Sequence, residues 1–156
     1  MSLTNWLLFL HLLGAIAFFA GGAVAGTLQL GAIRRERPSE IALLLQLTRA
    51  GVVLVGIGAL FTLAFGIALA HHEGISMSAT WIQAALGLWV AAMALGGYGG
   101  RTARKARHLA GELAAAGDRP SSELHELVAA RLPLWSSYAS MLCLLAILVL
   151  MVWKPA

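Results

Sequence analysis

The chain has 156 residues, of which 60% are hydrophobic and only 12% are charged, about half the charged share of a typical soluble domain. This composition excludes a soluble protein, because it leaves too little polar surface to cover an apolar core. The single cysteine, Cys143, excludes an internal disulfide bond and any multi-cysteine zinc or iron–sulfur site. We therefore expect an all-α, polytopic membrane protein with one domain over residues 1–156.

The first apolar run covers residues 6–32 and is long enough to predict a membrane-spanning helix. Trp6 has the amphipathic ring that is typical of a membrane interface. His11 is the only ionisable side chain of the run. At helical spacing it shares a face with Gly22 and Gly26, so it is predicted to face another helix rather than lipid.

Three further apolar runs predict three more spans in chain order. They cover residues 42–71, 80–99 and 134–153. Ser39 is suited to cap the second of these helices at its N-terminus. The expected fold is therefore a bundle of four transmembrane helices.

A helical hairpin is expected between the third and fourth spans. Residues 101–116 keep a helical composition outside the membrane, and residues 117–120 contain the Gly and Pro of a turn. Ser121 or Ser122 is suited to cap a second short helix. The two segments carry apolar stripes that predict contact with each other.

The basic residues define the expected orientation. Ten of the eleven Lys and Arg residues lie in or beside the loop after the first span and the loop between the third and fourth spans, and only Lys154 does not. Loops rich in Lys and Arg usually face the cytoplasm. The ten are Arg34, Arg35, Arg37, Arg49, Arg101, Arg104, Lys105, Arg107, Arg119 and Arg131. We therefore expect both termini outside the cytoplasm and the hairpin inside.

The basic hairpin has a simple physical role in this arrangement. Arg101, Arg104, Lys105 and Arg107 are expected to contact anionic lipid head groups, which attract basic segments at the cytoplasmic surface. The same distribution accounts for the isoelectric point near 10.0. A nucleic-acid partner is not expected, because the chain has no separate basic domain.

Histidines are the candidate ligands of this chain. An ionisable side chain inside a span is a functional hypothesis by default, so His11 is a candidate ligand for haem or a metal. His71, His72 and Glu73 lie on the same side of the membrane and are weaker candidates for a copper or zinc site with it. The alternative is a neutral imidazole that bonds a neighbouring helix, with Gln83 as its partner.

Two pairs of glycines match a spacing that favours close helix contact in membranes. They are Gly22 with Gly26, and Gly96 with Gly100. The spacing predicts packing either within the bundle or between copies, and it does not distinguish the two.

Short motifs along nearly the whole chain resemble a group of four-helix bacterial membrane proteins. They are Trp6-Leu-Leu-Phe-Leu-His11, Phe18-Phe19-Ala-Gly21, Thr80-Trp81-Ile82, Gly100-Arg101, Pro133-Leu134 and the closing Leu148 to Pro155. The group includes an integral-membrane family of unknown function (domain-of-unknown-function family 2269). It also includes HemJ-type protoporphyrinogen oxidases and, more distantly, CopD-type copper-resistance membrane domains.

The resemblance to HemJ-type proteins implies haem b binding through the first-helix histidine, to which His11 corresponds. Other positions depart from that pattern. Gln83 to Ala85 replace a lysine, Gly97 to Gly99 replace a histidine, and residues 31–35 lack a second histidine. The resemblance therefore implies the bundle and His11 without the oxidase activity.

Two functional classes follow from the sequence. The first is a non-catalytic accessory or scaffold protein that binds other membrane subunits or copies of itself, because no complete catalytic site is present. The second is a membrane protein that binds haem b, or less readily copper, through His11. The chain contains no Ser-His-Asp arrangement, paired intramembrane carboxylates or phosphate-binding loop, so enzymatic activity is not expected.

Overall fold

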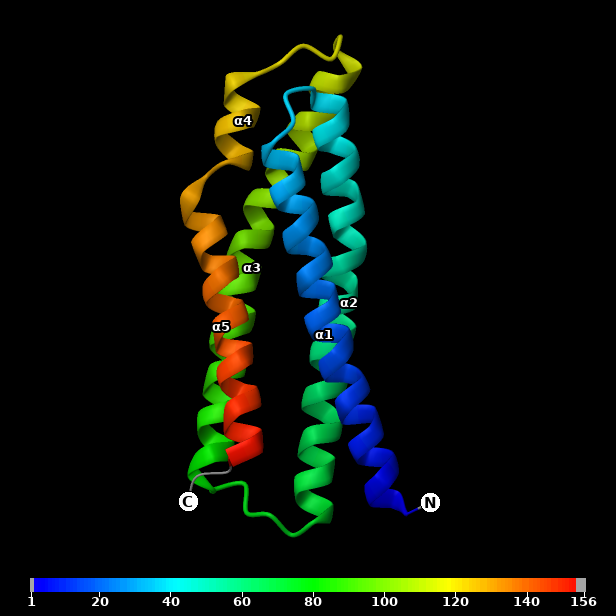
Figure 1. Ribbon diagram of the computed structural model, residues 1–156, viewed down its shortest axis with the longest axis vertical. Helices are drawn as coiled ribbons and strands as arrows, with labels where there is room; N and C mark the ends of the chain where they lie inside the picture. Colours follow the sequence, from blue (N-terminus) through cyan, green and yellow to red (C-terminus); the bar gives the residue numbers. More distant parts are fainter. Residues whose placement is uncertain (1, 154–156) are drawn as a thin grey trace.

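The computed structural model describes residues 2–153 and forms five α-helices in that range (Figure 1). Their bounds are α1 Leu3–Ile33, α2 Pro38–His72, α3 Thr80–Ala115, α4 Ser122–Val128 and α5 Arg131–Trp153. Four of the helical segments are long and apolar enough to cross a membrane, with α4 leading into the last of them. The all-α architecture with four spans is therefore confirmed. Lys154, which entered the charge count, lies outside the described residues.

The long helices run up and down as two packed pairs. α1 lies along α2, α3 lies along α5, and α2 adjoins α3 (Figure 1). The first turn of α1 and the last turn of α5 lie at the end of the bundle opposite to α4. An even number of spans requires this arrangement.

α3 is one continuous helix, although a span and a separate helical segment were expected. It runs through the glycine cluster at residues 96–100 without a break and reaches Ala115. Its 36 residues extend roughly 54 Å, well beyond the ~30 Å hydrocarbon core of a bilayer. The C-terminal part of α3 therefore projects beyond the membrane and supplies one side of the expected hairpin.

The largest fully buried side chains lie at the α4 end, where most of them belong to a cluster that we call the head core. Its buried members are Ala32, Ile41, Leu45, Ala106, Ala110, Leu124 and Val128. The apolar stripe of α4 packs here against α1 and the projecting part of α3, in one cluster with side chains of α2. Water surrounds this end, so the hydrophobic effect favours the burial of apolar side chains there. Lipid is itself apolar, so the side chains of the spans gain no such free energy from burial.

The N-terminus of α2 is capped from a distant turn. The helix begins at Pro38, and its N-cap residue Arg37 makes no side-chain cap bond. Ser39, the expected N-cap, lies inside the first turn, and that expectation was wrong. Its N–H and its Oγ each donate a hydrogen bond of 2.7 Å to the carboxylate of Asp118. Asp118 lies in the α3–α4 turn, where its backbone has φ +53°.

Candidate functional site

The His11 side chain joins α1 to α2 through a hydrogen bond. Its Nδ1 lies 2.8 Å from the main-chain carbonyl oxygen of Thr62. A carbonyl only accepts, so Nδ1 carries the proton and the lone pair of the neutral ring is on Nε2. Gly66 makes room for the ring, because a Cβ at this position would lie 2.9 Å from both Cε1 and Nδ1 of His11.

Two polar residues that were expected near His11 have other partners. Gln83, proposed as the hydrogen-bond partner of His11, instead donates from Nε2 to the carbonyl of Met77 at 2.7 Å. Glu73 accepts a hydrogen bond of 2.9 Å from the hydroxyl of Thr4. The Glu73 contact ties the N-terminal end of α1 to the C-terminal end of α2. The expectation of a His11–Gln83 pair was therefore wrong.

The remaining histidine candidates lie at the C-terminal end of α2. His71 and His72 are exposed there, five and six residues beyond the glycine that faces His11. That separation is roughly 8 Å along the helix. Among residues 2–153, no three His, Cys, Asp or Glu side chains are grouped so that they could hold a metal ion. His11 is thus not brought together with His71, His72 and Glu73.

Hydroxyl side chains inside the spans bond main-chain carbonyl oxygens of the bundle. These bonds join Thr27 to Ala23, Thr48 to Leu44, Thr62 to Gly58, Ser136 and Ser137 to Pro133, and Ser140 to Ala92. The Ser140 bond crosses from α5 to α3. In a span, such bonds satisfy hydroxyls that lipid cannot, so these side chains act as structural groups.

Trp89 of α3 is the exception to this pattern. Its Nε1 is buried without a hydrogen-bond partner among residues 2–153. The ring packs against the central membrane cluster of Phe18, Ala59, Ala92 and Leu144. Trp89 therefore contributes apolar packing there, with its one donor unused.

Glycines allow a close approach of α1 and α2. A Cβ at Gly21 would lie 2.7 Å from the main-chain oxygen of Gly51, and a Cβ at Gly14 would lie 2.6 Å from the main-chain nitrogen of Thr62. A Cβ at Gly58 would collide with the main chain of Phe18. We call Gly14, Gly21, Gly51 and Gly58 the glycine seam. Their spacing of seven residues on each helix keeps all four at one interface.

The four glycines that the sequence singled out lie away from this seam. A Cβ at Gly26 or Gly100 would meet no atom within 4 Å, and a Cβ at Gly22 would meet only Met141 Sδ at 3.9 Å. A Cβ at Gly96 would touch Ser140 Oγ at 3.4 Å. Gly26 and Gly100 therefore do not mediate close packing within residues 2–153, and packing between copies stays a prediction.

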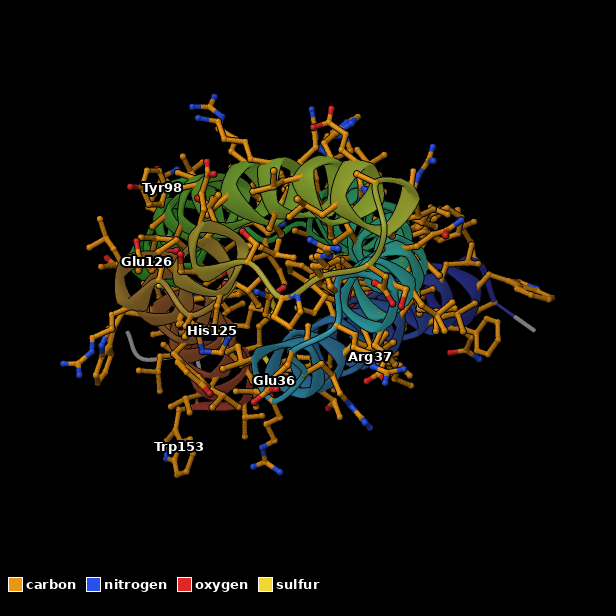
Figure 2. The ribbon with its side chains drawn as sticks, turned by 90° about the horizontal axis from the view of Figure 1, so that it is seen from above. Glu36, Arg37, Tyr98, His125, Glu126 and Trp153 are labelled. Atoms are coloured by element: carbon orange, nitrogen blue, oxygen red, sulfur yellow. The ribbon has the colours of Figure 1, made fainter. Side chains whose placement is uncertain are left out.

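The basic side chains surround the α4 end. Arg101, Arg104 and Lys105 are exposed and Arg107 is half-buried, on the part of α3 that begins to project beyond the membrane. Seen along the bundle from this end, charged side chains project outward around the rim (Figure 2). These positions are compatible with contact to lipid head groups, which stays a prediction.

Two shallow hollows lie on the helix surfaces. The α1 hollow has a volume of about 360 Å³ and is lined by Ala23, Val24, Thr27 and Leu28. The α5 hollow has a volume of about 310 Å³ and is lined by Arg131, Leu134, Trp135 and Tyr138.

The α5 hollow was missed by sequence reasoning. Arg131, Trp135 and Tyr138 stand at positions i, i+4 and i+7, which places them on one face of a helix. That spacing could have predicted the hollow from the sequence.

Comparisons with known proteins complete the description of the site. No curated protein and no solved structure matches the chain. The model of a family described as "Predicted integral membrane protein (DUF2269)" matches residues 5–155. The match covers all four spans and the head core. The chain therefore belongs to this family of integral membrane proteins.

Proposed function

We propose that the protein is a non-catalytic scaffold of the bacterial inner membrane that binds the helices of other subunits or of its own copies. The observation that carries this proposal is the use of His11 and of the span hydroxyls in the bundle's own hydrogen bonds. His11 and Ser140 bond the main chain of a neighbouring helix, and the other span hydroxyls bond the main chain of their own helix, so these donors are used within the bundle. Lateral contact is the function that this surface then offers.

The open side of α1 is the candidate contact surface. Gly26 is exposed with nothing near it, and the α1 hollow lies beside it. Small residues on a lipid-facing helix let a second helix approach closely, which favours van der Waals packing and weak Cα–H hydrogen bonds. A helix of a neighbouring subunit or of a second copy would fill this hollow.

Energy transfer between labelled copies in vesicles, together with the mass of the complex in mild detergent, tests the proposal. Gly26→Leu is expected to weaken association at least fivefold, because the side chain fills the approach. Ala64→Leu on the exposed face of α2 is the matched control and should change little. A wild-type protein that stays a partner-free monomer in both measurements would rule out the scaffold.

A second candidate function is haem b or copper binding through His11. The observation that favours it is the Nδ1 hydrogen bond to Thr62, which orients the ring and leaves Nε2 as a free ligand atom. Among residues 2–153, no three His, Cys, Asp or Glu side chains are grouped around a common point, so a copper ion at His11 would need further ligands from a partner. Haem b would need only this axial ligand and an apolar surface.

An absorption spectrum of the purified protein separates the two candidates. A Soret band that disappears in His11→Ala, or copper found by elemental analysis, would support cofactor binding. A protein without either signal would leave the scaffold as the function.

A further inference from the structure

The α5 hollow combines a cation, two amphipathic aromatic rings and an apolar floor on one helix face. Arg131 is the first residue of α5, and Leu134, Trp135 and Tyr138 follow within two turns. The lining contains no acidic side chain, and the first turn of α5 has none either. The hollow is therefore positive on the side nearest α4 and apolar toward the span.

The polar tips that line this hollow have no partners in the protein. Within residues 2–153, the structure records no hydrogen bond or ion pair for the side chains of Arg131, Trp135 and Tyr138. Trp135 is 70% exposed and Tyr138 is 52% exposed. These groups are therefore available to a ligand from outside the chain.

The location of the hollow decides which ligand it meets. α5 begins where the head ends and the apolar span begins, which is the membrane interface on the basic side. Trp and Tyr favour this depth because one end of each ring is apolar and the other is polar. A molecule that occupies the hollow must carry a negative group at the level of Arg131 and an apolar part beside Leu134.

We propose that the α5 hollow binds one anionic phospholipid from the leaflet on the α4 side. The Arg131 guanidinium binds the lipid phosphate through charge-assisted hydrogen bonds. Trp135 and Tyr138 contact the glycerol backbone, and the acyl chains continue into the bilayer past Leu134. A volume of about 310 Å³ is at the lower end for small-molecule sites, which suits a head group whose tails lie outside the hollow.

This site differs from the general attraction of the basic head for lipid. Arg101, Arg104, Lys105 and Arg107 attract anionic lipid through charge alone, which falls off over the Debye length. The α5 hollow adds aromatic and apolar contacts around one cation. We therefore expect one lipid to bind in the hollow with defined stoichiometry, in addition to the lipids that the basic head attracts loosely.

Native mass spectrometry of the full chain in detergent tests the proposal. The protein is titrated with phosphatidylglycerol, phosphatidylcholine or inorganic phosphate. One tightly bound phosphatidylglycerol is expected. Arg131→Gln should weaken its binding about fivefold, the contribution of one basic residue near a membrane surface. Arg119→Gln, which removes an exposed charge from the α3–α4 turn, is the matched control and should leave the affinity within about twofold.

The aromatic contact has its own matched pair. Trp135→Leu is expected to weaken the binding of phosphatidylglycerol, whereas Trp153→Leu at the opposite end of α5 should not. Arg131→Lys keeps the charge and should retain binding if Arg131→Gln disturbs the fold. Equal effects of the two arginine variants or of the two tryptophan variants would overturn the proposal. Equal binding of phosphatidylcholine, or displacement of the lipid by inorganic phosphate, would also overturn it.

Discussion

At the residue scale, the structure gives His11 a structural contact that the sequence left open. A lone histidine in an apolar span carries either a ligand or a hydrogen bond to a neighbour. Nδ1 lies 2.8 Å from a carbonyl of the adjacent helix, and the ring lies over Gly66. The same bond that holds α1 to α2 also presents Nε2, so a structural role and a ligand role are compatible in one side chain.

His11→Phe tests the contribution of this hydrogen bond. The substitution keeps an aromatic ring over Gly66 but removes the donor, so it should destabilise the bundle by about 1 kcal/mol, the range found for hydrogen bonds between helices in membranes. Thermal unfolding in detergent, followed by circular dichroism, measures the change. His72→Ala removes an exposed imidazole and is the control, with an expected change within about 0.5 kcal/mol. Equal effects of the two variants would contradict a stabilising His11–Thr62 bond.

At the scale of the elements, the α1–α2 pair depends on contact between main chains. At the glycine seam, main-chain atoms of α1 and α2 occupy the space that side chains would fill at other residues. Lipid-exposed spans gain nothing from burying apolar surface, so close van der Waals contact supplies the stability of the pair. The position of each glycine on its helix therefore matters more than the number of glycines.

Gly21→Ala and Gly26→Ala are a matched pair on one helix. The first methyl group would meet the main chain of Gly51 and Val55, and the second would meet nothing. We expect Gly21→Ala to cost about 1–3 kcal/mol, as overpacking does, and to lower the melting temperature. Gly26→Ala should leave the melting temperature unchanged or raise it, because alanine favours the helix. Similar losses from both would argue against the seam.

The Asp118 cap on α2 gives the head core a dependence on pH. The hydrogen bonds from the side chain and main chain of Ser39 hold the pKa of Asp118 below its ordinary value of 3.8, and the charge of Arg37 acts in the same direction. A lowered pKa means that the stabilisation is present above pH 3.8 and is lost as the pH falls through the lowered value.

The difference in melting temperature between the wild type and Asp118→Ala measures this cap. At pH 7 the variant should melt lower, because α2 loses its only side-chain cap among the described contacts. The difference should shrink as the pH is lowered below 3.8, where the wild-type carboxylate also becomes protonated. A difference that stays constant from pH 7 to pH 2.5 would contradict a charged cap.

At the scale of the whole molecule, charge divides the bundle into two ends. All ten Lys and Arg residues of the described chain belong to segments at or near the α4 end, and the α2–α3 turn has none. The positive-inside rule predicts that the α4 end faces the cytoplasm. The opposite end, with Thr4 and Glu73, would then face the other side of the membrane.

Labelling of single introduced cysteines tests this orientation. In a Cys143→Ala background, Ser76→Cys on the α2–α3 turn should react with a membrane-impermeant maleimide in intact cells with a permeable outer envelope. Arg119→Cys on the α3–α4 turn should react only after the membrane is opened. The reverse pattern would invert the topology.

The sequence by itself determined the four spans, the basic end and the hairpin with its apolar stripes. These features depend on local composition and on helical periodicity, and they require no knowledge of neighbours. Leu124 and Val128 are an example, because their spacing of four residues on a polar helix predicts a buried stripe, and both are buried in the head core. Ser121 likewise caps α4 as its position predicts.

The tertiary structure alone decided which side chains meet. Thr62 rather than Gln83 accepts the hydrogen bond from His11, and Asp118 caps α2 in place of Ser39, across 51 and 79 residues respectively. Helices that are apolar on all sides carry little information on their rotation, because lipid and protein neighbours favour the same side chains. Only the register of α1 against α2 distinguishes Gly21, which contacts main chain, from Gly26, which stays open.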